Sequence, residues 1–365
     1  MSNKKLTILG IVAIVMVILA GVQMRLSATH PSATLSGPTY LIQGLDTNKI
    51  ASIVLGKGDE QIILTRSGNR FVVANKDDYP AKTTEINGVI AACLDIKTAE
   101  FITDNPANHA DLGVTEADAG HIVKLFGSDG NPIIGLFMSP PDPDKNGSYV
   151  RLISSNDVYL TIGRSWPASF SDMDFIDTVL LNVIRDKIKS VTVTSPDESY
   201  NLSKSDTGVI ELTNIPEGKK LRQAVSDPVF NAVENLTFDD VTKDASDLKF
   251  DSTYISRLDD STVYTLSVAE KDGKTYVKCQ AEFTDQTIVT KDEEVESEEE
   301  LKKKEAILLA RDSARSFNEK HAGWIYQIPR YKADNITKKS EELLEDKVDE
   351  NDDEQSEDPG RDDES

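Results

Sequence analysis

The chain has 365 residues, a formal net charge of −23 and two cysteines. The acidic balance argues against nucleic acid as a partner, because a polyanion requires a basic surface. Two cysteines cannot build a disulfide scaffold, and the length is sufficient for two domains with ordinary hydrophobic cores.

Residues 1–26 have the features of an N-terminal transmembrane anchor. Lys4 and Lys5 precede an uncharged run at residues 6–22, which as a helix is close to the shortest membrane span. The positive-inside rule then keeps the N-terminus in the cytoplasm and places the bulk of a single-pass protein outside the cell membrane. A cleaved signal peptide and a buried cytosolic helix are the alternatives. Residues 27–39, rich in Ser, Ala, Thr, Pro and Gly, are expected to form a spacer.

The next part of the chain contains two related halves, residues 40–185 and 186–335. The segment from Ile50 matches the segment from Ile188 without a gap for more than twenty residues, at an offset of 138. A constant offset of domain size indicates that a whole folding unit has been duplicated.

Each half is expected to begin with a three-stranded meander followed by a helix. Alternating apolar and polar residues predict the strands, and apolar residues at helical spacing predict the helices. Pro228 is expected in the first turn of the second helix, after Ser226 and Asp227 as candidate caps. The predicted strands are residues 50–55, 61–66, 70–74, 188–194, 199–204 and 208–213. The apolar helix faces contain Val89, Ile90, Ala92, Cys93 and Ile96, and then Val229, Phe230, Val233 and Leu236.

Further strands are expected to close each half, which completes an α+β fold. The prediction is two tandem copies of a twisted antiparallel sheet with a covering helix, preceded by one transmembrane helix. In this alignment Cys93 and Cys279 correspond to the apolar residues Val233 and Leu136, which favours two separate buried thiols over a Cys93–Cys279 disulfide. The closing strands are residues 122–126, 133–138 and 158–162, matched to 263–268, 275–281 and 324–328.

The halves differ most at residues 286–320, a charged insertion in the second half. Ser297-Glu-Glu-Glu300 is a capping-box sequence, and apolar residues at helical intervals follow it, so the insertion is predicted to contain a helix. A solvated helix is one interpretation, and a lid or docking arm is the other. Residues 336–365 contain fourteen acidic and four basic residues and are predicted to be a disordered acidic tail.

The order of these parts resembles a bacterial family classified as domain-of-unknown-function family 4340, over residues 1–335. The resemblance is carried by the lysine-flanked anchor and by five stretches: SIVLGKGDEQIILTRSGNRFVV, YPAKTTEINGVIAACLDI, HADLGV, SYVRL and DVYLTI. The chain departs from the family pattern at Phe71, where a tryptophan is usual, and at Leu112-Gly113-Val114. Members resemble extracytoplasmic companions of gliding-type ABC transporters, which implies partnership with a transporter complex. The family supplies no catalytic residues.

The residues do not predict a catalytic, cofactor-binding or metal-binding site. The histidines are not spaced as metal ligands and are expected at surfaces or strand ends. Asp142-Pro-Asp144-Lys-Asn146-Gly147 matches the first positions of a calcium loop, but Ile153 stands where a glutamate is required, so a polar hairpin turn is favoured. Asp59-Glu60 and Asp197-Glu198 are adjacent acids that point to different faces, which favours solvated turns over catalysis. The histidines are His30, His109, His121 and His321.

Several aromatic residues lie near the ends of predicted strands and form the last candidate site. They are expected to pack inward, but if one or two face outward they offer a glycan or peptide site. These residues are Tyr149, Tyr159, Trp166, Trp324 and Tyr326.

Taken together, the residues and the resemblance predict a membrane-anchored extracytoplasmic interaction subunit, accessory to an ABC-type transporter complex and without enzymatic activity. Its expected partners are the transporter's membrane subunits, and it contacts the membrane through residues 6–22. The alternative is a cell-envelope module that binds a glycan or a peptide. An enzyme whose site is assembled from distant acids is the third hypothesis.

Overall fold

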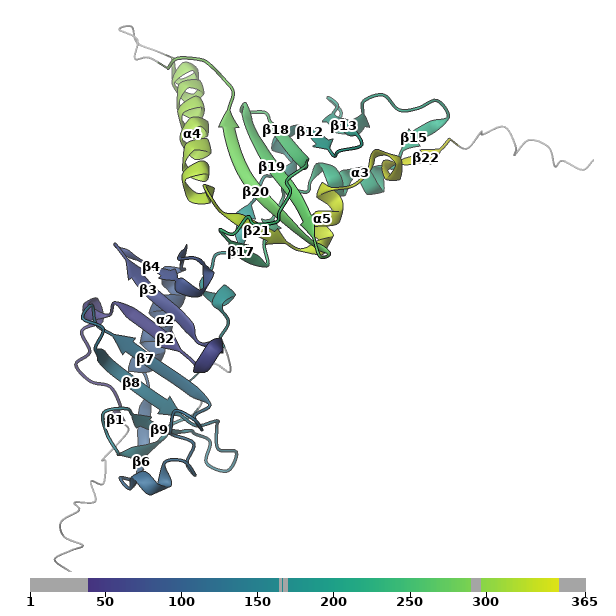
Figure 1. The fold of residues 1–365 in the computed structure, drawn as a ribbon. Helices are drawn as coiled ribbons and strands as arrows, with labels where there is room; N and C mark the ends of the chain where they lie inside the picture. Colours follow the sequence, from purple (N-terminus) through teal and green to yellow (C-terminus); the bar gives the residue numbers. More distant parts are fainter. Residues whose placement is uncertain (1–38, 164–165, 167–169, 290–296, 348–365) are drawn as a thin grey trace, which may run out of the picture. The chain divides into compact units, whose positions relative to one another are not determined.

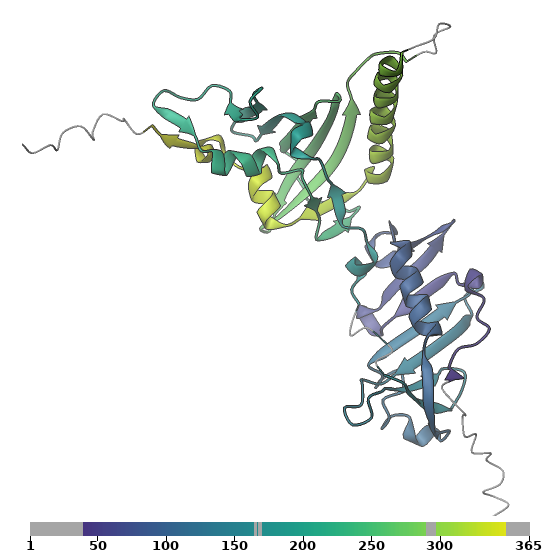
Figure 2. The ribbon, with the colours of Figure 1, turned by 180° about the vertical axis from the view of Figure 1, so that it is seen from behind.

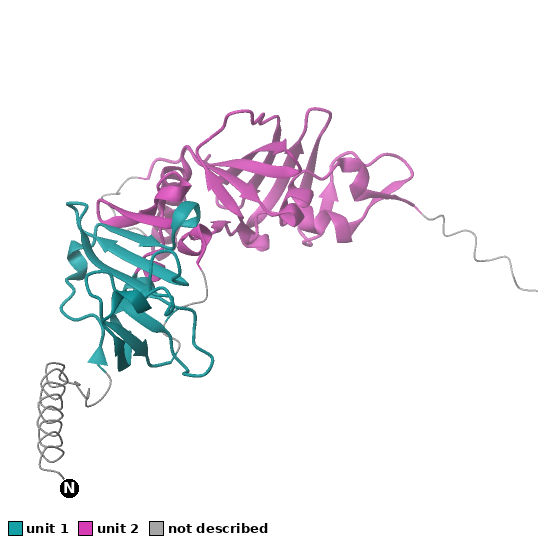
Figure 3. Cartoon of the chain, turned by 60° about the horizontal axis from the view of Figure 1, so that its bottom comes forward, with its two compact units in different colours: residues 1–61, 87–169 teal, residues 62–86, 170–365 magenta. Residues whose placement is uncertain are grey.

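The computed structural model describes residues 39–163, 166, 170–289 and 297–347. The chain forms two compact units: unit 1 contains residues 1–61 and 87–169, and unit 2 contains residues 62–86 and 170–365 (Figure 3). The predicted anchor and nearly all of the predicted spacer lie outside the described residues. In the part of the chain that the structure describes, no helix is both long enough and apolar enough to cross a membrane.

The strands of unit 1 form an antiparallel sheet, as the predicted α+β class requires. Their order across the sheet is β1-β6-β10-β9-β8-β7-β2. Helix α2 (Thr83–Leu94) lies across one face of this sheet, as Figures 1 and 2 show from opposite sides. The strands are β1 (Thr39–Tyr40), β2 (Ser52–Leu55), β6 (Lys97–Thr103), β7 (His121–Phe126), β8 (Pro132–Met138), β9 (Tyr149–Leu152) and β10 (Val158–Thr161).

Unit 2 is built around an antiparallel sheet of eight strands in the order β14-β13-β12-β18-β19-β20-β21-β17. The meander β3-β4-β5 also belongs to this unit. The sheet strands are β12 (Ile188–Thr194), β13 (Ser199–Lys204), β14 (Ile210–Leu212), β17 (Asp240–Thr242), β18 (Ser252–Leu258), β19 (Thr262–Lys271), β20 (Lys274–Phe283) and β21 (Ile325–Ile328). The meander strands are β3 (Ile62–Ser67), β4 (Arg70–Val73) and β5 (Tyr79–Pro80).

Three further helices and two short strand pairs complete unit 2. The C-terminus of α3 is bonded to the sheet, because the hydroxyl of Tyr254 on β18 donates to the carbonyls of Val229 (2.8 Å) and Phe230 (3.2 Å). The helices are α3 (Gln223–Phe230), α4 (Glu298–His321) and α5 (Arg330–Ile336). The strand pairs are β11 (Val179–Leu181) with β16 (Leu236–Thr237), and β15 (Lys219–Leu221) with β22 (Leu344–Asp346).

The same order of antiparallel pairings occurs in both units. β2 pairs with β7 in unit 1, and β12 pairs with β18 in unit 2. The meander from β7 to β10 then has the same neighbours as the meander from β18 to β21, and β6 closes the first as β17 closes the second. This shared order is compatible with the duplication predicted from the sequence.

The predicted matching is wrong by one strand for the first two pairs of closing strands, whereas the match of residues 158–162 with 324–328 agrees with the pairing order. The sequence alignment paired residues 122–126 with 263–268, whereas the pairing order matches β7 with β18 and β8 with β19. Neighbouring antiparallel strands share the same period-2 alternation, so the pattern alone fits either register. With the corrected matching, Cys279 corresponds to Leu152 instead of Leu136, because Cys279 is opposite Leu266 and Leu152 is opposite Leu136.

The second helix begins earlier than predicted. Helix α3 starts at Gln223, which lies 140 residues after the first residue of α2, and Pro228 stands inside it instead of in its first turn. Ser226 is fully buried within the helix and caps nothing. Pro228 lacks the N–H that would donate to the carbonyl four residues earlier, so it weakens the first turn of the helix. α3 ends at Phe230 and is four residues shorter than α2.

The region predicted to be a disordered tail begins with folded structure. Ile336 and Leu343 are buried, and β22 pairs with β15, where Lys219 lies 2.6 Å from Asp346. The acidic composition hid these few apolar anchors, whose partners are distant in the sequence. Residues 348–365 lie outside the described part. The predicted insertion helix is confirmed as α4, which begins after the Ser297–Glu300 capping box.

A leucine pair tests whether the segment after α5 belongs to the core. Leu343→Ala is expected to lower the free energy of unfolding by about 2–5 kcal/mol, because the side chain is fully buried and truncation leaves a cavity. Leu309→Ala is the matched control, since Leu309 is 61% exposed and its truncation should change stability by less than about 0.5 kcal/mol. Urea unfolding measures both. Equal, small effects would show that the C-terminal segment is only loosely attached.

Candidate functional site

A buried aromatic cluster marks the end of β21 in unit 2. Tyr326 is fully buried at its centre. The ring of Phe238 lies 4.8 Å from that of Tyr326, and Trp324 and Tyr79 pack edge to face at 4.8 Å. Tyr79 lies 6.3 Å from Tyr326 and comes from β5, far away in the sequence. The cluster is therefore completed by a side chain that no local pattern connects to β21.

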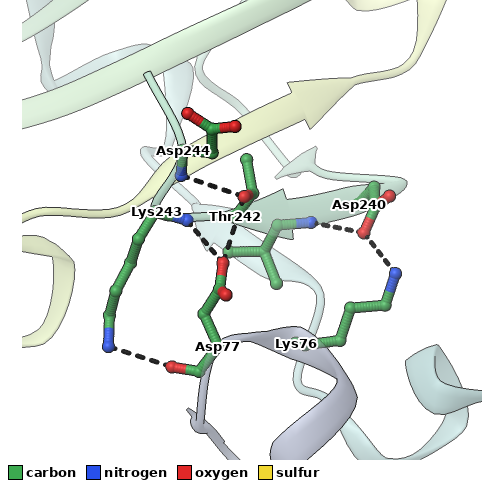
Figure 4. Close-up of polar contacts among 7 residues, drawn as sticks. Lys76, Asp77, Asp240, Thr242, Lys243 and Asp244 are labelled. Atoms are coloured by element: carbon green, nitrogen blue, oxygen red, sulfur yellow. Dashed lines mark hydrogen bonds and ion pairs between the residues drawn. The ribbon is translucent and has the colours of Figure 1, made fainter. Parts of the chain in front are cut away.

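Polar contacts fasten the turn that carries Tyr79 to the edge strand β17 (Figure 4). The Lys76 ammonium lies 2.8 Å from the Asp240 carboxylate. The Asp77 carboxylate accepts from the hydroxyl of Thr242 at 3.1 Å and from the backbone N–H of Lys243 at 2.8 Å. The Lys243 ammonium donates to the Asp77 carbonyl at 2.9 Å. These contacts hold the segment Lys76–Tyr79, which we name the aromatic turn, in place.

The aromatic turn holds two residues in an uncommon backbone conformation. Asp77 and Asp78 have φ values of 54° and 63°, in the left-handed region that disfavours most side chains. Aspartate tolerates this region better than most residues, and the contacts to β17 offset the remaining strain.

Two histidines predicted at surfaces are in fact buried. His321 at the end of α4 is 2% exposed, and its Nδ1 lies 2.6 Å from the Tyr326 hydroxyl. Burial, reinforced by the neighbouring Lys320, lowers the pKa of His321 to about 4. His109 is also buried, with Nε2 3.0 Å from the Asn156 carbonyl. Asn156 is 47 residues away from His109. Tyr326 is only five residues after His321 but lies on the strand that follows the helix, so neither contact is visible as a spacing pattern. His121 begins β7, as expected of a strand-end residue.

Strand register places Tyr159 of unit 1 at the position that Tyr326 has in unit 2. Tyr159 is opposite Val150, and Tyr326 is opposite Val277. The two valines are themselves equivalent, because Val150 is opposite Met138 and Val277 is opposite Val268, and these two residues have equivalent positions on β8 and β19. On the other side Tyr159 is opposite Phe101, whereas Tyr326 is opposite Val241.

The neighbours of this tyrosine differ between the units. Counting along the matched strands, Trp324 corresponds to Asp157 and Phe238 corresponds to Thr98. Thr98 and Asp157 are smaller and polar, and a pocket of about 250 Å³ opens beside Tyr159. We name it the Tyr159 pocket. Its lining is Thr39, Tyr40, Leu41, Gln43, Thr98, Leu152, Ser155, Asp157 and Tyr159.

The Tyr159 pocket is bordered by exposed aromatic rings. Tyr40 is 47% exposed beside the Lys97 ammonium, and Phe101 is 46% exposed and packs edge to face on Tyr159 at 5.8 Å. Burial and the nearby Asp157 raise the pKa of Tyr159, so its hydroxyl remains a neutral donor and acceptor. Two tyrosine rings and two leucines among polar groups can bind a ring-bearing ligand.

Among the other predicted aromatic residues, Trp324 and Tyr326 pack inward as expected. Tyr149 is half-buried, and its hydroxyl donates to Asp142 at 3.1 Å. Trp166 is also half-buried. Tyr159 alone of the predicted set lines one of the described pockets together with other aromatic residues.

The calcium-loop sequence forms the hairpin turn that the sequence favoured. Asp142 and Gly147 make an isolated antiparallel bridge between β8 and β9, with the Asp142 N–H 2.7 Å from the Gly147 carbonyl. The Asp142 carboxylate accepts from the Asp144 N–H at 2.9 Å. Within the described ranges, no group of three or more Cys, His, Asp or Glu side chains is placed to hold a metal ion.

The adjacent acids have different environments in the two halves. Asp59 and Glu60 are exposed in a short 3₁₀ turn, as predicted. Asp197 is exposed, but the Glu198 carboxylate accepts from the backbone N–H of Ser340 at 3.0 Å and from its hydroxyl. Glu198 is therefore an anchor for the C-terminal segment and not a solvated turn residue.

Both cysteines are free thiols. Cys93 lies on α2 in unit 1 and Cys279 lies on β20 in unit 2. Burial raises the pKa of the Cys93 thiol to about 12 and also raises that of Cys279. Neither thiol is suited to act as a nucleophile near neutral pH, because the thiolate is the reactive form.

Helix α4 presents an apolar strip on its outer side. Ala310 and Ala314 are buried against the sheet, whereas Leu301 and Leu308 are exposed. Two exposed leucines seven residues apart share one helix face, and at 100° per residue this face lies opposite the buried alanines. Leu309 adds a third exposed apolar side chain beside them. We name Leu301, Leu308 and Leu309 the outer leucine face.

The buried histidine gives a pH-dependent contribution to stability. The pKa of His321 is about 4 in the folded protein, below its ordinary value of 6.5, so the unfolded chain binds a proton first as the pH falls. The free energy of unfolding should therefore decrease between pH 6.5 and pH 4, by up to about 1.4 kcal/mol per pH unit from this group. His321→Phe should flatten the slope in urea unfolding measured across this range. Identical slopes in the two proteins would contradict the assignment.

Comparison with known proteins gives a family but no described activity. No curated protein and no solved structure matches the chain. The model of one family, described as Domain of unknown function (DUF4340), matches residues 72–252, which run from β4 to the first residue of β18. The chain belongs to this DUF4340 family.

Proposed function

We propose that this protein is a membrane-anchored extracytoplasmic interaction subunit, accessory to an ABC-type transporter complex and without enzymatic activity. The apolar run at residues 6–22 supports the anchor, and the resemblance to companions of gliding-type transporters supports the partner. The observation that carries the proposal is the outer leucine face of α4. A protein surface that exposes aligned large apolar side chains is suited to contact another protein.

The charges on α4 favour a docking role for this face. Lys302 pairs with Glu298 at 2.6 Å, and Lys303 pairs with Glu299 at 2.8 Å. Because these charges are paired within the helix itself, a partner needs no complementary charges to bind them. The leucines are then the side chains whose removal from water contributes most to the free energy of binding. The partner surface that fits them is an apolar groove, such as one between helices of a membrane subunit.

A second function has its own observation in unit 1. The Tyr159 pocket has aromatic walls and polar groups, which supports a module that binds a glycan or a peptide. The larger grooves of unit 2, of about 440, 610 and 710 Å³, are lined mainly by charged, polar and small residues and support such a ligand less well.

In-cell photo-crosslinking tests the docking role of α4. A photo-reactive phenylalanine analogue at Leu308 in the full-length chain is expected to capture ABC-transporter membrane subunits, identified by mass spectrometry. Leu301→Glu combined with Leu309→Glu should reduce that capture by about tenfold or more, because charges replace the apolar contact. Stability should change by less than about 0.5 kcal/mol, since both side chains are exposed.

The same analogue at Val209 is the matched control, because Val209 is 49% exposed on a different element of unit 2. Equal capture from positions 308 and 209 would show that the contact is not specific to the outer leucine face. Recovery of cell-wall fragments without transporter subunits would favour the second function.

A further inference from the structure

We infer that the Tyr159 pocket of unit 1 is a socket for a partner's peptide turn that carries an aromatic side chain, as the aromatic turn does within unit 2. The inference deepens the second function proposed above, the peptide-binding module. It assigns the ligand class from an occupied counterpart inside the same chain.

The counterpart shows how such a turn is held. Tyr326 occupies the strand position of Tyr159, and the turn inserts Tyr79 among the rings beside it. The burial of Tyr326 is complete as a result. In unit 1 the equivalent tyrosine is only half-buried, and Phe101 beside it is 46% exposed. The structure thus has a tyrosine at the same position of the sheet twice, covered by Tyr79 in unit 2 and open in unit 1.

The open platform has room for a ring. Where unit 2 has Trp324 and Phe238, the pocket is lined by Asp157 and Thr98. The lost aromatic volume leaves the cavity of about 250 Å³, which has Tyr159 as one wall. A partner's aromatic side chain placed there would make with Tyr159 the edge-to-face contact that Tyr79 makes with Tyr326 in unit 2.

The edge strand next to the pocket is also accessible. β1 pairs with β6 only at Lys97 and Thr98, so within the described residues the rest of this edge has no strand partner. In unit 2 the equivalent edge is β17, whose Asp240 accepts Lys76 of the turn. Glu100 of β6 corresponds to Asp240. Glu100 is opposite Leu160, the residue after Tyr159, and Asp240 is opposite Gln327, the residue after Tyr326.

The chemistry of the occupant follows from these positions. An exposed carboxylate at Glu100 and an open aromatic pocket fit a turn with a basic residue close before an aromatic one, the spacing of Lys76 and Tyr79. A peptide is favoured over a glycan because the occupied counterpart holds a peptide turn. A sugar stacked on Tyr159 is the competing outcome of the test.

Binding of a cyclic peptide to the full chain tests the inference. The probe reproduces residues 75–80, Asn-Lys-Asp-Asp-Tyr-Pro, and binding is followed by NMR of ring-labelled tyrosines. The resonances of Tyr159 and Tyr40, assigned with single Tyr→Phe variants, are expected to shift with the peptide. They should not shift with a peptide in which the tyrosine is alanine, because the ring supplies the contact.

Tyr159→Ala is the discriminating variant, since it removes the ring that stands at the strand position of Tyr326, and its binding is followed through the Tyr40 resonance. It should weaken peptide binding by about tenfold or more. Val209→Trp adds a tryptophan to an exposed position of unit 2 and should leave binding unchanged. Tyr40→Ala, which removes one wall of the pocket, should also weaken binding, so the result does not depend on one variant.

Three outcomes would overturn the inference: no shift at millimolar peptide, binding that Tyr159→Ala leaves intact, or shifts of Tyr159 produced only by an oligosaccharide such as cellohexaose. A failure here leaves the crosslinking of Leu308 unaffected, because that experiment reads a different surface. A failure of the Leu308 capture likewise leaves the peptide result standing.

Discussion

Strand register is the constraint on which the rest of this structure depends. In an antiparallel sheet it fixes which side chains share a face, and it places a tyrosine next to a valine at equivalent points of both units, Tyr159 and Val150 in one and Tyr326 and Val277 in the other. A large ring at such a point must be covered or remain partly in water. Unit 2 covers it with Tyr79, carried on a turn with two left-handed aspartates. That an uncommon backbone conformation is retained there shows that the contacts it makes outweigh its strain.

The sequence predicted the parts of the fold that depend on local pattern. β12 begins and ends at the predicted residues, and the neighbouring meander strands agree within two residues. The capping box at Ser297 marked the start of α4 correctly, because its signal is contained in four consecutive residues. The α+β class followed from the same patterns. These features share one property, which is that the residues that decide them lie next to each other in the chain.

What the sequence missed depends on contacts between different elements of the fold. The open state of the Tyr159 pocket follows from Asp157 and Thr98 standing where unit 2 has two aromatic rings, and that comparison needs the corrected strand matching. The burial of His321 follows from its contact with Tyr326. The folded start of the acidic tail follows from the burial of Leu343, which a strongly charged composition does not reveal. In each case the local pattern was compatible with more than one environment.

The insertion in unit 2 supplies helix α4, which covers an exposed edge of the sheet. β20 continues six residues past the part that β21 covers, because β21 pairs only with residues 275–277. An uncovered strand edge of this kind favours edge-to-edge association. α4 covers it through Asn318, whose carboxamide accepts from the Ala281 N–H at 2.8 Å and donates to the Ala281 carbonyl at 2.7 Å, as a neighbouring strand would.

The same helix that satisfies this edge cannot bury both of its sides. Once Ala310 and Ala314 face the sheet, residues on the opposite side must face solvent, and three of these are leucines. Polar residues at those positions would serve edge protection equally well, since Leu301 and Leu308 take no part in the contact with Ala281. Edge protection therefore explains the inner face of α4 and leaves its outer leucines unexplained. The partner proposed above for the outer leucine face would account for them.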